Sequence, residues 1–269
     1  MQIKTVVIGA AGRMGRELVA AVMNDEQLQL VGAVERDACP VLGQDAGSLA
    51  GCGEAGVRIS ADLRAALAGA DAMIDFSSLE AVVDNARAAV AAGCVAVIGI
   101  TGLEAEARGQ LAALADEGGR IVLAPNMSVG VNLLFHLCRQ VAPILGGQYD
   151  IEVVEMHHNQ KKDAPSGTAV RLGEVLAEAT GRDYDRDAVH GRQGMVGARN
   201  GREIGMHAVR GGDVVGDHTV IFATGGERVE LTHKASGRQT FCKGAVRAVK
   251  YLLESAPGLF DMQDVLGLR

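Results

Sequence analysis

Residues 155–169, with the sequence EMHHNQKKDAPSGTA, concentrate groups that can hold and transfer protons. Two histidines (His157, His158) and two lysines (Lys161, Lys162) lie within six residues of a chain that contains only 7 histidines. Histidine titrates near neutral pH and can relay a proton, and lysine combines a positive charge with a proton that it can donate. This combination indicates acid–base chemistry on an anionic substrate.

A Pro-Ser-Gly-Thr turn follows the cluster and leads into residues 168–179, which have helical spacing. Ser166 or Thr168 is the expected N-cap of this helix. Backbone amides, the Thr168 hydroxyl and the positive end of the helix dipole then converge on one point, where a carboxylate binds well. The plainer alternative is a solvated loop before a capped helix. No metal site is expected, because adjacent strand residues point to opposite faces and no HExxH or CxxC motif is present.

The first half of the chain alternates short apolar strands with Ala- and Leu-rich helical segments. This alternation predicts an α/β fold, a Rossmann-like doubly wound parallel sheet built from right-handed βαβ units. The expected strands are 3–8, 28–34, 72–75, 95–100 and 121–123, and the expected helices are 14–23, 63–67, 79–92 and 103–115. The Gly-rich residues 43–57 are predicted to form a surface loop.

The pattern changes after about residue 127, which indicates a second α+β domain. The expected elements are a helix at 129–145, a strand at 149–156, a helix at 168–179, a mobile loop at 181–202, strands at 203–209, 218–224 and 228–233, and a last helix at 241–253. Consecutive strands joined by short turns favour an antiparallel or mixed sheet. We therefore expect a dinucleotide-binding domain of residues 1–127 together with 241–269, and a second domain of residues 128–240.

The stretch VVIGAAGRMGREL joins a strand, a glycine turn and a helix start, with Gly9, Gly12 and Gly15 spaced as GxxGxxG. Small residues let the backbone approach a pyrophosphate, and the helix N-terminus binds its charge. Glu35 ends the second strand, where an acid accepts hydrogen bonds from an adenosine ribose. Arg36 can meet a 2′-phosphate, so both NADH and NADPH are expected cofactors. A tight turn and a solvated strand end are the alternatives.

Three further strands end in small polar turns: DFSS (75–78), GITG (99–102) and APNMS (124–128). In a doubly wound sheet such ends line one crevice, where ligands bind. Gly99 and Thr101 are expected to flank the nicotinamide ribose, and Asn126 to bind the carboxamide. Any one of them alone has a second explanation as turn chemistry.

Composition excludes several other classes of protein. The net charge of −7 disfavours nucleic acid or an anionic membrane as the main partner, and no apolar run reaches the ~18 residues of a membrane span. The chain enters a strand at once, so no signal peptide is expected. The 5 cysteines are an odd number without CxxC spacing, which fits free thiols in a reducing cytoplasm.

EMHHNQKKDAPSGTA closely resembles the signature of the dihydrodipicolinate reductase (4-hydroxy-tetrahydrodipicolinate reductase) family of the diaminopimelate–lysine pathway. The resemblance extends over the whole chain, through IGAAGRMG, SVGVN, ERVELTHKASGRQTFCKGAVRA and GLFDM. It implies a Rossmann-like cofactor domain closed by the C-terminal helix, a substrate domain with a mixed sheet, and a homotetramer. It also implies reduction of a cyclic unsaturated imine dicarboxylate by NADH or NADPH.

By the same resemblance, His157 is the proton donor or acceptor and Lys161 is the proton donor. The expected contacts to the substrate carboxylates are His158, Ser166, Gly167 and Thr168. The expected cofactor contacts are Gly9, Ala10, Ala11, Gly12, Arg13, Met14, Glu35, Arg36, Gly99, Ile100, Thr101, Ala124, Pro125, Asn126 and Met127. Two of these depart from the family pattern, because Ile100 stands where threonine is usual and Met127 where phenylalanine is usual. Only backbone contacts are expected to survive these changes.

Two rival functions follow from the same sequence. Another two-domain NAD(P)-dependent reductase of amino-acid metabolism, of the homoserine or aspartate dehydrogenase type, would share the fold. The His-His-Lys cluster argues against it. A regulator that binds NAD(P)H without turnover would have lost that cluster or gained a DNA-binding module, and the sequence shows neither change.

Overall fold

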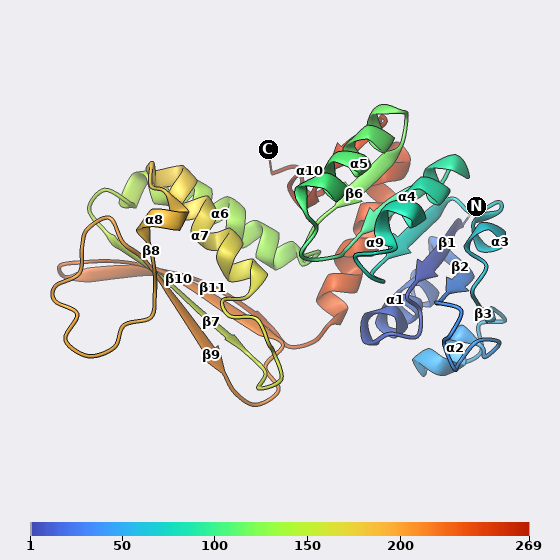
Figure 1. Ribbon diagram of the computed structural model, residues 1–269, viewed down its shortest axis with the longest axis horizontal. Coiled ribbons are helices and arrows are strands. Elements are labelled where there is room, and N and C mark those ends of the chain that lie inside the picture. Colours follow the sequence, from blue (N-terminus) through green and yellow to red (C-terminus); the bar gives the residue numbers. More distant parts are fainter. Residues whose placement is uncertain (1, 269) are drawn as a thin grey trace. The chain divides into compact units, whose positions relative to one another are not determined.

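The computed structural model describes residues 2–268, which form two compact units. The first unit contains the chain up to Val129 together with the chain from Arg238 onward, and the second contains Gly130–Gly237. Each unit has its own sheet (Figure 1).

The sheet of the first unit is a parallel Rossmann-like sheet. Its strands within the described residues are β1 (Ile3–Ile8), β2 (Leu28–Val34), β3 (Ile59–Ser60), β4 (Ala72–Asp75), β5 (Val95–Ile98), β6 (Arg120–Leu123) and β12 (Gly258–Phe260). They pair in the order β12-β6-β5-β4-β1-β2-β3, and every pair is parallel. The order reverses at β1, as in a doubly wound fold, so the predicted fold class is confirmed.

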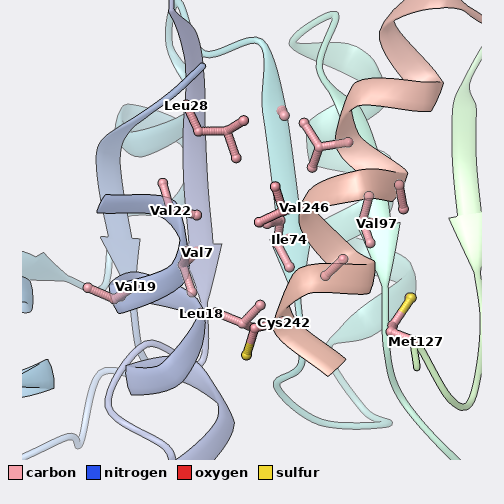
Figure 2. Packing of buried hydrophobic residues seen from close by; sticks show 14 of the residues in the cluster. Val7, Leu18, Val19, Val22, Leu28, Ile74, Val97, Met127, Cys242 and Val246 are labelled. Atoms are coloured by element: carbon pink, nitrogen blue, oxygen red, sulfur yellow. The ribbon is translucent and has the colours of Figure 1, made fainter. Parts of the chain in front are cut away.

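Helices cover both faces of this sheet. They are α1 (Arg13–Met23), α2 (Ala46–Ala50), α3 (Leu63–Leu67), α4 (Val82–Ala91), α5 (Ala105–Asp116), α9 (Gln239–Glu254) and α10 (Met262–Leu266). Side chains alternate along each strand, so Val7 packs in the cluster formed with α1 and α9, whereas Val6 packs in the cluster formed with α4 and α5. Figure 2 shows Leu18 of α1 and Val246 of α9 beside the strand residues Val7 and Ile74. Helix α9 is therefore part of the first unit.

The second unit has an α+β fold in which helices pack on a mixed sheet. Its elements are α6 (Val129–Leu145), β7 (Asp150–His157), α7 (Gly167–Thr180), α8 (Tyr184–Asp187), β8 (Ala188–His190), β9 (Ile204–Arg210), β10 (Gly216–Thr224) and β11 (Glu227–Ala235). The strand order is β11-β10-β7-β9-β8; β10 is antiparallel to both neighbours, while β7, β9 and β8 run parallel. Helices α6 and α7 pack on one face through a core that includes Phe135, Leu172 and Phe222. The predicted mixed sheet is confirmed.

Two stretches that the sequence predicts as loops contain regular structure. Within residues 43–57, Asp45 accepts a hydrogen bond from the Ser48 amide (2.8 Å) and begins α2, whose first residue Ala46 is buried. The stretch 181–202 contains α8 and β8, and Arg199 within it makes hydrogen bonds with Asp150 and Glu152. The loop predictions were wrong at Ala46–Ala50 and at residues 184–190, where caps and ion pairs order polar residues, whereas residues 51–57 and 191–202 contain no helix or strand.

Candidate active site

The glycine turn after β1 is built to hold an anion against the backbone. Gly9 has φ +73°, and a Cβ added at Gly15 would lie 2.0 Å from the carbonyl oxygen of Gly9. Helix α1 therefore starts directly on the turn, as only glycine permits. Gly12 is the N-cap and has no side chain, so the first amides of α1 stay accessible to a ligand. These residues fit the pyrophosphate of a dinucleotide.

Glu35 lies at the end of β2 and contacts this turn. Its Oε1 accepts a hydrogen bond from the Ala11 amide (2.9 Å), and the amides of Gly9 and Ala10 donate to the carbonyl of Val34 (2.9 and 3.2 Å). The acid predicted to bind a ribose is thus fixed beside the turn predicted to bind the phosphates. Arg36 follows as an exposed side chain. The geometry fits an adenosine ribose, with a guanidinium available next to it.

The ends of β4 and β5 shape the neighbouring part of the sheet edge. Asp75 is fully buried and accepts hydrogen bonds from the Ser77 amide and the Asn85 side chain (both 2.8 Å). Ser77 in turn lies so close to Gly9 that a Cβ there would be 3.1 Å from its Cα. The Phe76 ring covers Gly99, where an added Cβ would lie 2.0 Å from the ring. Packing against Phe76 therefore requires glycine at position 99, in addition to the predicted contact of Gly99 with a ligand.

The two residues that depart from the family pattern have buried side chains. Ile100 is 9% exposed and packs with the α4 and α5 side of the sheet, and Met127 is 1% exposed and packs with the α9 side (Figure 2). Only their backbones can meet a cofactor. Asn126 uses Oδ1 to accept a hydrogen bond from the Ser128 amide (2.9 Å), just before α6.

The remaining predicted cofactor positions lie on these same turns. Ala10 and Ala124 are buried, Met14 is half-buried, and Arg13, Thr101 and Pro125 are exposed. All the predicted cofactor residues therefore lie at or beyond the carboxyl ends of β1, β2, β5 and β6, or at the start of the helix that follows β1. In open parallel sheets this is the edge where ligands bind.

In the second unit, His157 is the last residue of β7 and is 9% exposed. Its Nδ1 lies 2.6 Å from Oε2 of Glu155, two residues earlier on the same face of the strand. The ring packs edge-on against His218 of β10, with 5.2 Å between centroids. A Cβ at Gly216 would lie 3.0 Å from Nε2, so this glycine gives the ring its space.

Glu155 is the centre of a buried polar network. Arg210 donates two hydrogen bonds to its carboxylate, from Nη1 to Oε2 and from Nη2 to Oε1 (both 2.8 Å). The Ser166 amide donates to Oε1 (2.9 Å). Burial raises the pKa of Glu155, but the hydrogen bonds from Arg210, His157 and Ser166 outweigh burial and hold the pKa below its ordinary value. Glu155 is therefore an anion with each oxygen doubly hydrogen-bonded.

The histidines of the network are neutral at neutral pH. Burial lowers the pKa of His157, and the nearby Glu155 carboxylate offsets that effect only in part. Burial lowers the pKa of His218 to about 3. His218 is 3% exposed, and its Nε2 lies 3.1 Å from the Ser166 hydroxyl.

The start of α7 is formed as predicted, with Ser166 as the N-cap. Its Oγ accepts a hydrogen bond from the Ala169 amide (3.2 Å), which decides between the two expected caps. Ser166 is buried, Gly167 is exposed and Thr168 is half-buried. The first turn of α7 is therefore accessible at the two residues that follow the N-cap. The Ser166 hydroxyl therefore takes part in capping α7.

Lys161 and His158 lie in the turn between β7 and α7. Lys161 Nζ is 2.9 Å from Oδ2 of Asp163, and this ammonium helps to hold the pKa of Asp163 below its ordinary value against partial burial. The His158 amide donates to the carbonyl of Val214 (2.7 Å), which ties the turn to the connection between β9 and β10. Arg210 also donates to the carbonyl of Asp163 (2.7 Å). The predicted substrate and acid–base residues are thus held in one hydrogen-bonded neighbourhood.

Sequence reasoning missed Glu155, Asp163, Arg210 and His218 as members of this site. Glu155 had a local signal, because residues i and i+2 of a strand share a face. Arg210 and His218 come from β9 and β10, and only the pairing register brings them to β7.

No three His, Cys, Asp or Glu side chains among residues 2–268 are placed to hold a metal ion. In the same residues, no helix is both long and apolar enough to cross a membrane.

Comparisons with known proteins cover both units. The model of "Dihydrodipicolinate reductase, N-terminus" matches residues 3–127, and that of "Dihydrodipicolinate reductase, C-terminus" matches residues 130–266. The chain is 54% identical to the 4-hydroxy-tetrahydrodipicolinate reductase of Syntrophotalea carbinolica, over 99% of this chain and 100% of the relative. It is 51% identical to that of Geotalea daltonii, with the same coverage.

Solved structures agree with the sequence comparisons. A dipicolinate-bound dihydrodipicolinate reductase from Paenisporosarcina sp. TG-14 superposes with a TM-score of 0.76 at 25% identity, over 98% of this chain and 99% of that one. An amine dehydrogenase from Mycobacterium smegmatis, at 18% identity and a TM-score of 0.57, shares the fold. Both halves of the chain match one family, and relatives above 50% identity span its whole length. The chain belongs to the dihydrodipicolinate reductase family.

Proposed function

We propose that this protein reduces 4-hydroxy-tetrahydrodipicolinate to tetrahydrodipicolinate with NADH or NADPH, in the diaminopimelate route to lysine. The observation that carries the proposal is the cluster at the end of β7, where His157, Lys161 and the start of α7 share one hydrogen-bonded network. Family membership supplies the substrate class. The network supplies what such a substrate needs, which is positive charge for two carboxylates and a source of protons.

The substrate carboxylates are bound by the turn and by the first turn of α7. The amides of Gly167 and Thr168 and the Thr168 hydroxyl lie at a helix N-terminus, which favours an anion. Lys161 and His158 add donors from the preceding turn. Ser166, whose hydroxyl accepts from the Ala169 amide, caps this helix and helps to bind a carboxylate at its start.

Lys161 is the proton donor, and His157 accepts or relays a proton. An ammonium carries a transferable proton at neutral pH, whereas the lowered pKa of His157 leaves its imidazole neutral. Asp163, 2.9 Å from Lys161, keeps the ammonium in this turn when substrate is absent. A carboxylate of the substrate can then compete with Asp163 for the same charge.

The first unit holds the dinucleotide through Gly9, Gly12, Gly15 and Glu35, whose geometry fits pyrophosphate and ribose. A nicotinamide dinucleotide held by these residues would supply the hydride for the reduction. Arg36 is the residue that accommodates the extra phosphate of NADPH.

Lys161→Ala and His157→Gln test the assignment. A positioned general acid contributes about 10²- to 10⁴-fold, so Lys161→Ala should lose that much turnover and some substrate affinity. His157→Gln keeps polarity but cannot relay a proton, so turnover should fall with a smaller change in KM. NADH affinity measured by calorimetry should stay near the parent value in both variants. Parent-like turnover in either variant would remove that residue from proton transfer.

We also propose a homotetramer, located in the cytoplasm. Helices α6 and α7 cover one face of the mixed sheet, while Val154, Met156 and Ile221 on the other face are only half-buried in the isolated chain. Such a face is suited to packing against copies of itself. Light scattering should give four times the 27.9 kDa chain mass, and a stable monomer would contradict the assembly. The five free thiols are compatible with a reducing compartment.

A further inference from the structure

Glu155 is a buried carboxylate to which the proposed reaction assigns no role. It is 1% exposed, it is ionised, and its two oxygens accept four hydrogen bonds. A buried charge is costly unless it is paired and fully hydrogen-bonded, so such a group is retained only where its partners satisfy it. One of those partners is the histidine proposed to handle protons.

The 2.6 Å contact between Glu155 Oε2 and His157 Nδ1 decides which ring nitrogen carries hydrogen. An ionised carboxylate can only accept a hydrogen bond, so Nδ1 must be the donor. In a neutral imidazole the other nitrogen, Nε2, then has the lone pair. Gly216 keeps the space beside Nε2 free, because its missing Cβ would lie 3.0 Å from that atom.

The same carboxylate also fixes the helix that binds the substrate. Its Oε1 accepts from the amide of Ser166, the N-cap of α7, and Arg210 bonds both oxygens and the carbonyl of Asp163. Through these contacts, one side chain sets the position of the acid–base strand relative to the anion-binding turn.

We propose that Glu155 is the positioning residue of this site: it holds His157 as the Nδ1–H tautomer, so that Nε2 is the nitrogen that exchanges protons with the substrate. Arg210 is its counter-ion and keeps the carboxylate ionised. The proposal rests on the reduction proposed above, for which it names the residue that prepares the histidine. Glu155 does not itself touch substrate: its effect on kcat passes through His157, whereas its bond to the Ser166 amide acts on substrate binding.

The first experiment needs no variant with altered Glu155 and no substrate. Nitrogen–proton correlation spectra of the full-length protein, recorded well above the pKa of His157, distinguish Nδ1–H from Nε2–H. The His157 signal is assigned by its loss in His157→Gln. The proposal expects the Nδ1–H pattern, and an Nε2–H pattern in the parent protein overturns it.

The second experiment asks whether Glu155 acts through His157. Glu155→Gln keeps the shape, but its amide can either accept from or donate to Nδ1, so His157 should become a mixture of tautomers. Carboxylate partners that orient metal-bound histidines contribute about 10- to 100-fold, and we expect kcat to fall by a factor of the same order here, with little change in NADH affinity. In a His157→Gln background, the same substitution should lower kcat by less than about twofold, because the histidine that it positions is gone; a change in KM through the Ser166 contact can remain. Equal losses in both backgrounds overturn the proposal.

Glu152 provides a matched control on the same strand. It also contacts a histidine and arginines, with 2.6 Å to His207 Nε2 and hydrogen bonds from Arg192 and Arg199, but it lies on the opposite face. In preparations whose mass by light scattering equals that of the parent, Glu152→Gln should leave kcat and the His157 tautomer unchanged. If it lowers kcat as much as Glu155→Gln does, loss of any carboxylate that is hydrogen-bonded to histidine and arginine explains the effect, and the positioning role is refuted. Absence of turnover in the parent protein would instead refute the proposed reaction, while the tautomer spectrum still decides the role of Glu155.

Discussion

Replacing Gly15 with alanine should damage the cofactor cradle, because this residue lies where α1 meets the glycine turn. The added Cβ would lie 2.0 Å from the Gly9 carbonyl oxygen and 2.7 Å from the Ala10 Cα. Non-bonded heavy atoms attract at about 3.5–4.0 Å, so helix and turn must separate by about 1 Å or more. Both contacts are with backbone, which cannot rotate away as a side chain would.

The size of the effect follows from two opposing contributions. Overpacking of this kind costs about 1–3 kcal/mol, whereas alanine in a helix is favoured over glycine by up to about 1 kcal/mol. The free energy of unfolding of Gly15→Ala should therefore fall by about 1–2 kcal/mol. A turn displaced by about 1 Å no longer matches a pyrophosphate, so the Kd for NADH should rise about 10-fold or more.

Gly109 in α5 supplies the control. A Cβ built there meets no described atom within 4 Å, and the residue is exposed. Gly109→Ala should stabilise the protein by about 0.5–1 kcal/mol and leave NADH affinity unchanged. Urea unfolding and calorimetric titration with NADH measure both quantities. If Gly15→Ala binds NADH as tightly as Gly109→Ala does, the cradle does not depend on the close approach of α1, and the reasoning fails.

Three further outcomes are expected. Arg36→Ala should weaken NADPH binding about 10-fold while NADH changes little, since a charge-assisted contact to the 2′-phosphate is lost; equal losses in calorimetry would refute that contact. Thr168→Val removes one hydroxyl, so the KM for substrate should rise about 2- to 10-fold with NADH affinity intact, and unchanged kinetics would make the helix start purely structural. The free energy of unfolding should fall as the pH drops from about 6.5 toward 3, because the pKa of His218 is lowered to about 3 in the folded state and the unfolded chain takes up that proton first. The slope from this group is at most about 1.4 kcal/mol per pH unit, and His218→Gln should reduce it in urea unfolding; an unchanged slope would assign the pH dependence to other groups.

The elements predicted well are those whose signal is local. Short apolar runs located β1 and β2 at their observed bounds, and helical spacing located α6 and α3. Strand β12 was missed because three residues, Gly258–Phe260, are too few for any period, and it exists only by pairing with β6. Helix α2 did have a readable signal, since Asp45 caps its start and Gly51 ends it with φ +76°.

The functional residues likewise divide into those with a local sequence signal and those without one. The cluster from His157 to Thr168 is contiguous in sequence, so its chemistry is visible without a structure. Arg210 and His218 are more than 50 residues away along the chain from His157 and reach it because β9 and β10 flank β7. No local pattern specifies that order, because β9 pairs parallel and β10 antiparallel with the same strand.

The two departures from the family pattern both fall in the first unit, in turns whose predicted cofactor contacts come from backbone. Ile100 and Met127 place their side chains in the cores on opposite faces of the sheet, where an apolar group of suitable size is enough. The dinucleotide turns can therefore tolerate changes of side chain as long as the chain path is kept. The β7–α7 network is built from side chains, with Glu155 accepting from His157, and each member there is fixed by a specific partner. Apolar substitutions of suitable size at the strand ends of the first unit should therefore change cofactor binding little. Substitutions of Glu155, which positions the histidine, should lower turnover.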